Sequence, residues 1–129
     1  MFLLQVIAQI VESDSLARPA DPWDASLPPK MGRRHTSVQA LRDAIDVRIL
    51  LFRTLPDAET AYLNTYRETA SGMGNELIIA GCRQRNDNLA RGVQSLAMRA
   101  KVLGFGFRLE DDVLCALPGG EVSATAANF

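Results

Sequence analysis

The residues of this chain that could carry covalent chemistry are few. His35 is the single histidine, and Ser37, Cys82 and Cys115 are the nucleophiles that it could activate. Nucleophilic catalysis needs a base within hydrogen-bond reach of the nucleophile, and no spacing in this sequence indicates such a pair. We therefore predict no catalytic residues and expect that the protein is not an enzyme.

Metal ligands are equally sparse in the sequence. Cys82 and Cys115 lack the CxxC spacing of a zinc site, and one histidine cannot complete a set of four ligands. We expect two reduced, mostly buried thiols. The acidic run at residues 110–112 is interpreted as the first turn of a helix, where carboxylates favour the positive end of the helix dipole. The prediction is accordingly no metal and no cofactor.

The composition indicates one ordinary globular domain. The 129 residues carry 14 Lys+Arg against 15 Asp+Glu, and 47% are hydrophobic, which excludes a disordered chain and a strongly basic nucleic-acid binder. The apolar stretch over residues 1–11 is shorter than the roughly 20 residues that span a membrane. The first basic residue is Arg18, whereas a secretory signal begins with a basic segment. We expect a cytoplasmic protein without membrane contact.

The clearest predicted element is a helix over residues 38–54. Thr36 and Gln39 have the spacing of a capping box, and Pro56 marks the stop. Apolar residues at steps of three and four predict the main buried stripe. It consists of Val38, Leu41, Ile45, Ile49 and Phe52.

Four further helices are predicted around this one. The spacing favours a helix over residues 2–12, although its β-branched residues leave a strand open. A second should begin at Pro56 and Asp57 and carry Tyr62 and Tyr66 on one side. Two more are expected over residues 88–103 and 109–117. The proline-rich segment 18–32 reads as an irregular connector, pinned to the core by Trp23 and Leu27.

These elements predict an all-α fold, a small bundle of about five helices with the irregular proline-rich connector. Residues 1–120 would form a single helical domain, and residues 121–129 a frayed C-terminal tail. The alternative is an α/β fold in which residues 47–52 and 76–81 form short parallel strands around the Tyr62 helix. Residues 76–81 are too short for periodicity to decide between helix and strand, and we favour helix because no other segment offers a convincing strand partner.

The most informative feature of the 38–54 helix is a second apolar side. Val47, Leu50 and Leu51 lie away from the main stripe on a helical wheel, and Met98 and Val102 repeat this pattern more weakly in the 88–103 segment. Either the helix is central and enclosed, or these residues form a protein interface. The second interpretation predicts a non-catalytic protein–protein interaction module, an accessory subunit or adaptor, that self-associates as a homodimer.

The charges alternate in sign along the sequence, which complementarity between neighbouring helices explains most simply. The alternative is a small DNA-binding regulator whose arginine-rich surface neutralises phosphates. Its candidate nucleic-acid contacts are Lys30, Arg33, Arg34, Arg83, Arg85, Arg91, Arg99 and Lys101.

Overall fold

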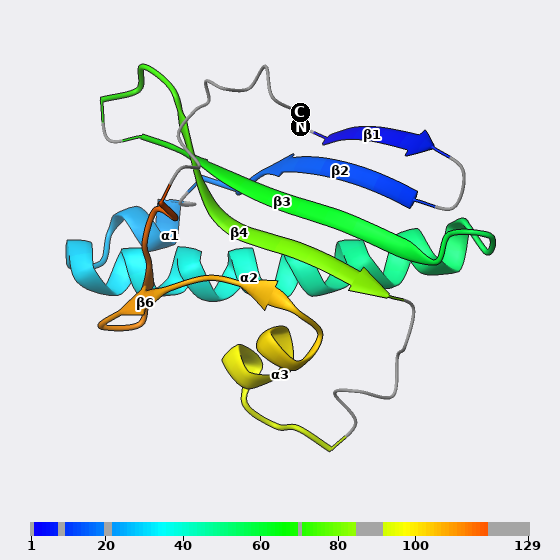
Figure 1. The fold of residues 1–129 in the computed structure, drawn as a ribbon. Coiled ribbons are helices and arrows are strands. Elements are labelled where there is room, and N and C mark those ends of the chain that lie inside the picture. Colours follow the sequence, from blue (N-terminus) through cyan, green and yellow to red (C-terminus); the bar gives the residue numbers. More distant parts are fainter. Residues whose placement is uncertain (1, 8–9, 20–21, 70, 85–91, 119–129) are drawn as a thin grey trace.

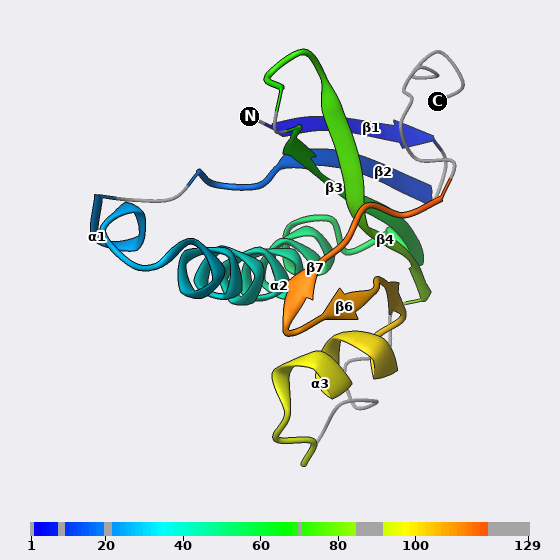
Figure 2. The same ribbon diagram turned by 90° about the vertical axis from the view of Figure 1, so that its left-hand side faces the viewer.

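The chain forms a mixed β-sheet with one long helix against it, so the predicted all-α bundle is wrong (Figure 1). The structure is a computed structural model, and it describes residues 2–7, 10–19, 22–69, 71–84 and 92–118. The long helix, α2, runs beneath the sheet, and a shorter helix, α3, lies on the side of α2 away from β1 and β2 (Figure 2). The predicted tail at 121–129 lies outside the described residues.

Two hairpins joined by a helical crossover build the sheet. Strands β1 (Phe2–Ile7) and β2 (Ile10–Leu16) pair antiparallel, as do β3 (Thr60–Glu68) and β4 (Asn75–Gln84). Strand β2 pairs parallel with β3 through the crossover helix, and the short β5 (Phe105–Gly106) adds to β4. The order β1-β2-β3-β4-β5 leaves β1 at one end of the sheet.

The tyrosines that predicted a helix lie instead on strand β3. Ala61, Leu63 and Thr65 are buried on the helix side of the sheet, whereas Tyr62 is 39% exposed on the other side. Side chains alternate sides along a strand, so residues four apart share one side in a strand as they do in a helix. The spacing of Tyr62 and Tyr66 therefore fits both structures, and the predicted helix is wrong.

The other short apolar segments are also strands. Residues 2–12, expected to be helical, contain β1 and the start of β2. Residues 76–81 lie within β4, the strand of the α/β alternative, but residues 47–52 belong to α2. The parallel pair of that alternative is therefore absent. The observed parallel pair is β2 with β3.

The predicted 38–54 helix is present and longer at its start. Helix α2 (Pro29–Thr54) has 26 residues, with Pro28 as its N-cap residue and Pro29 in the first turn. Proline is well suited to that position, since its missing N–H would have no partner there. Thr36, expected to be the cap, lies inside the helix. The connector thus covers less than residues 18–32, and it contains a single helical turn, α1 (Pro22–Ala25).

The buried side of α2 lies between the two apolar sides that the sequence shows. Val38 and Ile49 of the predicted stripe are 37% and 39% exposed. Arg48 is 1% exposed at the centre of the buried side, and its guanidinium lies 5.1 Å from the centre of the Phe52 ring. The buried residues are Gly32, Ser37, Ala40, Leu41, Ala44, Ile45, Arg48, Leu51 and Phe52.

The last two predicted helices are much reduced. Helix α3 (Leu96–Val102) covers the end of the expected 88–103 helix, of which residues 88–91 lie outside the described part. It is capped by Ser95, whose Oγ accepts a hydrogen bond from the amide of Met98 at 3.3 Å. Instead of a helix, residues 109–117 contain a second small sheet.

That second sheet is a hairpin of β6 (Leu109–Glu110) and β7 (Val113–Leu114). Asp111 and Asp112 form its turn with φ angles of 52° and 63°. Two central residues with positive φ match the twist of the flanking strands, and short acidic side chains tolerate this conformation better than most. The acidic run is therefore a hairpin turn and not the start of a helix.

A glycine in β4 provides space for an aromatic ring. A Cβ atom on Gly81 would lie 2.7 Å from Cδ1 of Phe105, which is 3% exposed. The ring of Phe105 therefore packs where any side chain at position 81 would be. This contact helps to hold β5 against β4 at the end of the sheet.

None of the described helices combines the length and the hydrophobicity that a membrane span requires.

Candidate functional site

The predicted interface residues do not form one continuous patch. Leu51 is buried in the core, Val47 is half-buried against it, and Leu50 is 60% exposed. Met98 is 53% exposed and Val102 half-buried, both on α3.

Opposite flanks of α2 separate the two groups. Leu41 and Ile45 line grooves together with Leu96 of α3, whereas Val47 lines a small cavity with Ala17, just beyond β2. At 100° per residue, Leu50 projects roughly opposite Leu41. It therefore lies on the flank of α2 away from α3. The chain itself covers both apolar sides of α2 in part, and it leaves Leu50 exposed.

Several predicted nucleic-acid contacts are engaged within the chain. Lys30 Nζ lies 3.2 Å from Asp111 Oδ2, and Arg34 Nε donates to the Asp111 carbonyl at 2.8 Å. Both side chains therefore hold the β6–β7 turn against the start of α2. Lys101 Nζ lies 4.8 Å from the centre of the Phe107 ring.

The remaining described members of that basic group lie on two different helices. Arg33 is exposed, and Arg99 lines the groove between α2 and α3. The side chain of Arg83, and all of Arg85 and Arg91, lie outside the described part of the structure. The shared phosphate-binding surface stays a prediction, with Lys30, Arg34 and Lys101 engaged in contacts within the chain.

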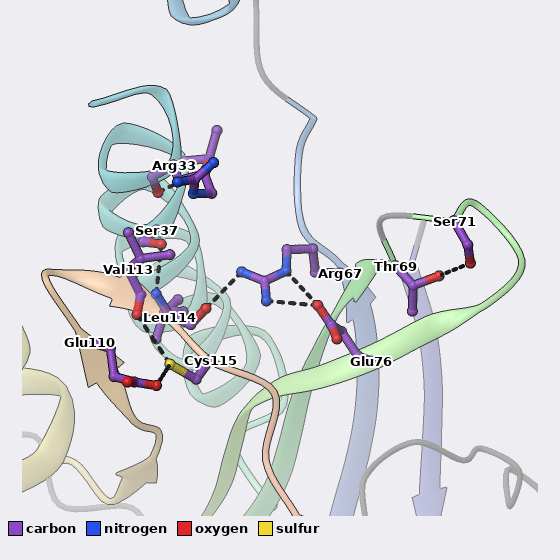
Figure 3. A network of polar contacts seen from close by, with 11 residues as sticks. Arg33, Ser37, Arg67, Thr69, Ser71, Glu76, Glu110, Val113, Leu114 and Cys115 are labelled. Carbon is purple, nitrogen blue, oxygen red and sulfur yellow. Dashed lines mark hydrogen bonds and ion pairs between the residues drawn. The ribbon is translucent and has the colours of Figure 1, made fainter. Parts of the chain in front are cut away.

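A polar network fastens the C-terminal segment to the sheet and to α2 (Figure 3). The buried Ser37 Oγ accepts a hydrogen bond from the Leu114 amide at 2.9 Å. Arg67 donates through Nε and Nη2 to Glu76 Oε1, at 3.0 and 2.7 Å, and through Nη1 to the Leu114 carbonyl at 2.8 Å. Both polar atoms of the Leu114 peptide backbone are therefore satisfied by side chains. The serine considered as a nucleophile has a structural contact.

Cys115 is a thiol in contact with an acid. Its Sγ donates to Glu110 Oε2 at 3.1 Å, across the β6–β7 hairpin. The hydrogen bond to Glu110 raises the pKa of the Cys115 thiol, and partial burial and the carboxylate charge act in the same direction. The arrangement favours the neutral thiol, which is the unreactive form. The side chain of Cys82 lies outside the described residues.

The side of the sheet away from α2 carries polar and aromatic residues. Asn64 Nδ2 donates to Asp14 Oδ1 at 3.2 Å across the parallel pair. Burial raises the pKa of Tyr66 to about 12, and the charge of Asp14 contributes. The phenol therefore stays neutral well above physiological pH, and a neutral phenol does not act as a general base.

An ion pair holds the connector onto α2. Arg18 donates through Nε and Nη2 to both oxygens of Asp43, at 2.8 and 2.7 Å, and Gln39 Nε2 donates to Asp43 Oδ1 at 2.9 Å. These hydrogen bonds, that from Arg18 foremost, hold the pKa of the Asp43 carboxyl below its usual range, against the effect of burial. The connector is thus positioned by a planar two-point contact.

Concave surfaces cluster around the first half of α2. A cavity of about 280 Å³ lies between the connector and α2, with Trp23 and His35 in its wall. A groove of about 430 Å³ lies on the other side of His35, between α2 and α3, with Leu41 and Leu96 in its lining. Trp23 is 59% exposed, so the prediction that it pins the connector to the core is wrong. No group of three metal-ligating side chains occurs among the described residues.

The edge strand β1 is a feature that sequence reasoning missed. Its outer edge has no neighbouring strand in the described part of the chain. The segment FLLQVI contains no charged residue and no proline, the usual protections of an exposed edge. The signal was present in the sequence, but it became meaningful once residues 2–7 were recognised as a strand.

No family model, curated protein or solved structure matches the chain.

Proposed function

We propose that the protein is a non-catalytic interaction protein that self-associates through strand β1. The observation that carries the proposal is the outer edge of β1, along which six uncharged residues have no neighbouring strand in the described part of the chain. Such an edge is a template for pairing with another strand. The contacts of the candidate nucleophiles support the non-catalytic part, because Ser37 binds a backbone amide and Cys115 binds Glu110.

A second copy of the chain is the partner that β1 fits. Two antiparallel copies of β1 centred on Leu4 would pair Phe2 with Val6 and Leu3 with Gln5. In the monomer, Phe2, Leu4 and Val6 lie opposite Ser15, Ser13 and Val11. The paired residues would all be uncharged and mostly apolar, so the junction would be free of like-charge repulsion.

Leu50 extends the same interface. It is 60% exposed on the flank of α2 opposite α3, the flank on which Asp43 and Val47 border the end of β2. A two-fold axis normal to the sheet at Leu4 would place both copies of α2 beneath one continuous sheet, with Leu50 of each facing the junction. Burial of this leucine adds about 25 cal/mol for each Å² of apolar surface covered.

Sedimentation across a dilution series tests the proposal. We expect the wild type to associate reversibly into dimers. Leu50→Arg and Leu4→Lys should shift it to monomer, because each places a charge at the junction. Met73→Lys is the matched control, since Met73 is 89% exposed in the β3–β4 turn and its substitution should leave association unchanged.

Circular dichroism shows whether each variant is folded. Leu50 is an exposed residue, so Leu50→Arg keeps the test meaningful if Leu4→Lys unfolds the strand. A wild-type chain that is monomeric at every concentration contradicts the proposal. So does association that both folded variants leave intact.

A further inference from the structure

The cavity beside Trp23 has the chemistry of a ligand site, at a place separate from β1. It occupies about 280 Å³, near the lower end of volumes that hold small molecules. Its lining combines rings, guanidinium groups and an amide. The lining residues are Arg18, Pro19, Trp23, His35, Thr36, Val38, Gln39 and Arg42.

One wall of the cavity is aromatic. Trp23 is 59% exposed and meets His35 edge to face, with ring centroids 5.0 Å apart and an interplanar angle of 72°. The turn that carries the indole is fixed by Ser26, whose Oγ donates to the Trp23 carbonyl at 2.6 Å. An indole with an open face is a surface on which a flat ring stacks, whatever the substituents of that ring.

The wall that α2 forms also has one cation available to an anion, about two turns after His35. Arg18 and Gln39 are both bound to Asp43, so the nearby carboxylate is already engaged. Arg42 is exposed, and it makes no ion pair or hydrogen bond with any described residue. Its planar guanidinium suits two-point binding of a phosphate or carboxylate. The fixed neighbours give this wall a defined shape before any ligand arrives.

We propose that this cavity binds a small anion that carries a flat aromatic ring. The ring would stack on Trp23 beside His35, and the phosphate or carboxylate group would contact Arg42. A mononucleotide has this combination, whether free or at the end of a single-stranded nucleic acid. The site does not depend on self-association through β1, because none of its lining residues belongs to that interface.

Titration with AMP tests the site by two independent measurements. Trp23 is the only tryptophan of the chain, so its fluorescence reports this cavity directly. Calorimetry measures the same binding in variants without the indole. We expect AMP to bind at least about tenfold more tightly than adenosine, which lacks the phosphate, or inorganic phosphate, which lacks the ring. A short single-stranded RNA then distinguishes a free mononucleotide from the end of a nucleic acid. If the RNA binds more tightly than AMP, the ligand is a single-stranded nucleic acid.

Variants locate the binding. Trp23→Ala and Arg42→Gln should each weaken AMP binding at least about fivefold, through loss of stacking and of the cation respectively. Arg53→Gln is the control, an exposed arginine at the far end of α2, and it should bind as the wild type does. The proposal is overturned if AMP, phenyl phosphate and benzoate all fail to give saturable binding. Binding that survives both substitutions also overturns it.

Discussion

At the scale of single residues, the chemistry of Cys115 is decided by its neighbour across the hairpin. A thiol reacts as its thiolate, and Glu110 opposes thiolate formation by accepting a hydrogen bond from the neutral thiol and by its own negative charge. Because the pKa is raised, the reactive fraction near pH 8 is smaller than that of an ordinary exposed cysteine. The half-exposed position of Cys115 is therefore no sign of a nucleophile.

We predict that Cys115 is alkylated slowly by iodoacetamide and that Glu110→Gln accelerates the reaction by about threefold or more. The glutamine keeps an acceptor but removes the charge, so the pKa of the thiol falls toward its usual value. Mass spectrometry of the peptide containing Cys115 measures its rate separately from that of Cys82. Asp57→Asn removes an exposed acid elsewhere and should not change the rate. An unchanged rate in Glu110→Gln would show that the carboxylate does not control the thiol.

At the scale of elements, the β6–β7 hairpin has a strained turn. Asp111 and Asp112 both have positive φ, which costs an L-residue on the order of 1 kcal/mol. Contacts from Lys30 and Arg34 to Asp111 hold the turn in place. Asp112 has no contact of this kind among the described residues, so its backbone strain is less compensated.

We predict that Asp112→Gly raises the thermal unfolding midpoint. Glycine adopts φ near 63° without strain, which adds up to about 1 kcal/mol to the free energy of unfolding. We expect this gain to exceed the entropic cost of ordering glycine from the unfolded chain. Gly72→Ala tests the same physics in reverse, because Gly72 has a φ of 74° and an added Cβ would make only a van der Waals contact, 3.4 Å from Glu68 Oε1. It should lower the midpoint. Calorimetry of both variants checks the pair, and a lower midpoint for Asp112→Gly would contradict the argument.

Local sequence pattern predicted the long helix but not its surroundings. The 38–54 helix has enough turns for its period to be unambiguous, and it is present within α2. The strands β1, β3 and β4 were missed or left open, because a spacing of four fits both helix and strand and because β-pairing depends on distant segments. The hairpin at 109–114 was missed because two acids with positive φ are an uncommon turn.

The candidate sites were predictable to a smaller extent. The second apolar side of α2 was visible in the sequence, and Leu50 is exposed, but Leu51 belongs to the core. The cavity beside Trp23 depends on how the connector crosses α2 through Arg18 and Asp43, residues 25 positions apart. No local pattern encodes such a crossing. The role of β1 as an edge requires the strand order, which only the tertiary structure supplies.

At the scale of the whole molecule, the two ends of the sheet differ in how many other elements pack beside them. On the β4 side of the sheet, α3 and the β6–β7 hairpin lie against α2, fastened by Arg67 and Ser37 (Figures 2 and 3). At the other end β1 closes the sheet without a neighbour among the described elements. Pairing between two copies would satisfy the edge and cover Leu50 in one step. Part of the stability of each chain would then come from its partner.

Thermal stability should therefore depend on protein concentration. When a folded dimer unfolds to two separate chains, mass action favours the folded state as concentration rises. For chains of this size, each tenfold increase should raise the unfolding midpoint by about 2–3 °C. Leu50→Arg should abolish this dependence and lower the midpoint at high concentration, whereas Met73→Lys should retain it. Scanning calorimetry over a hundredfold range, about two such steps, measures the effect. A midpoint for the wild type that does not move with concentration would mean that each chain completes its own fold.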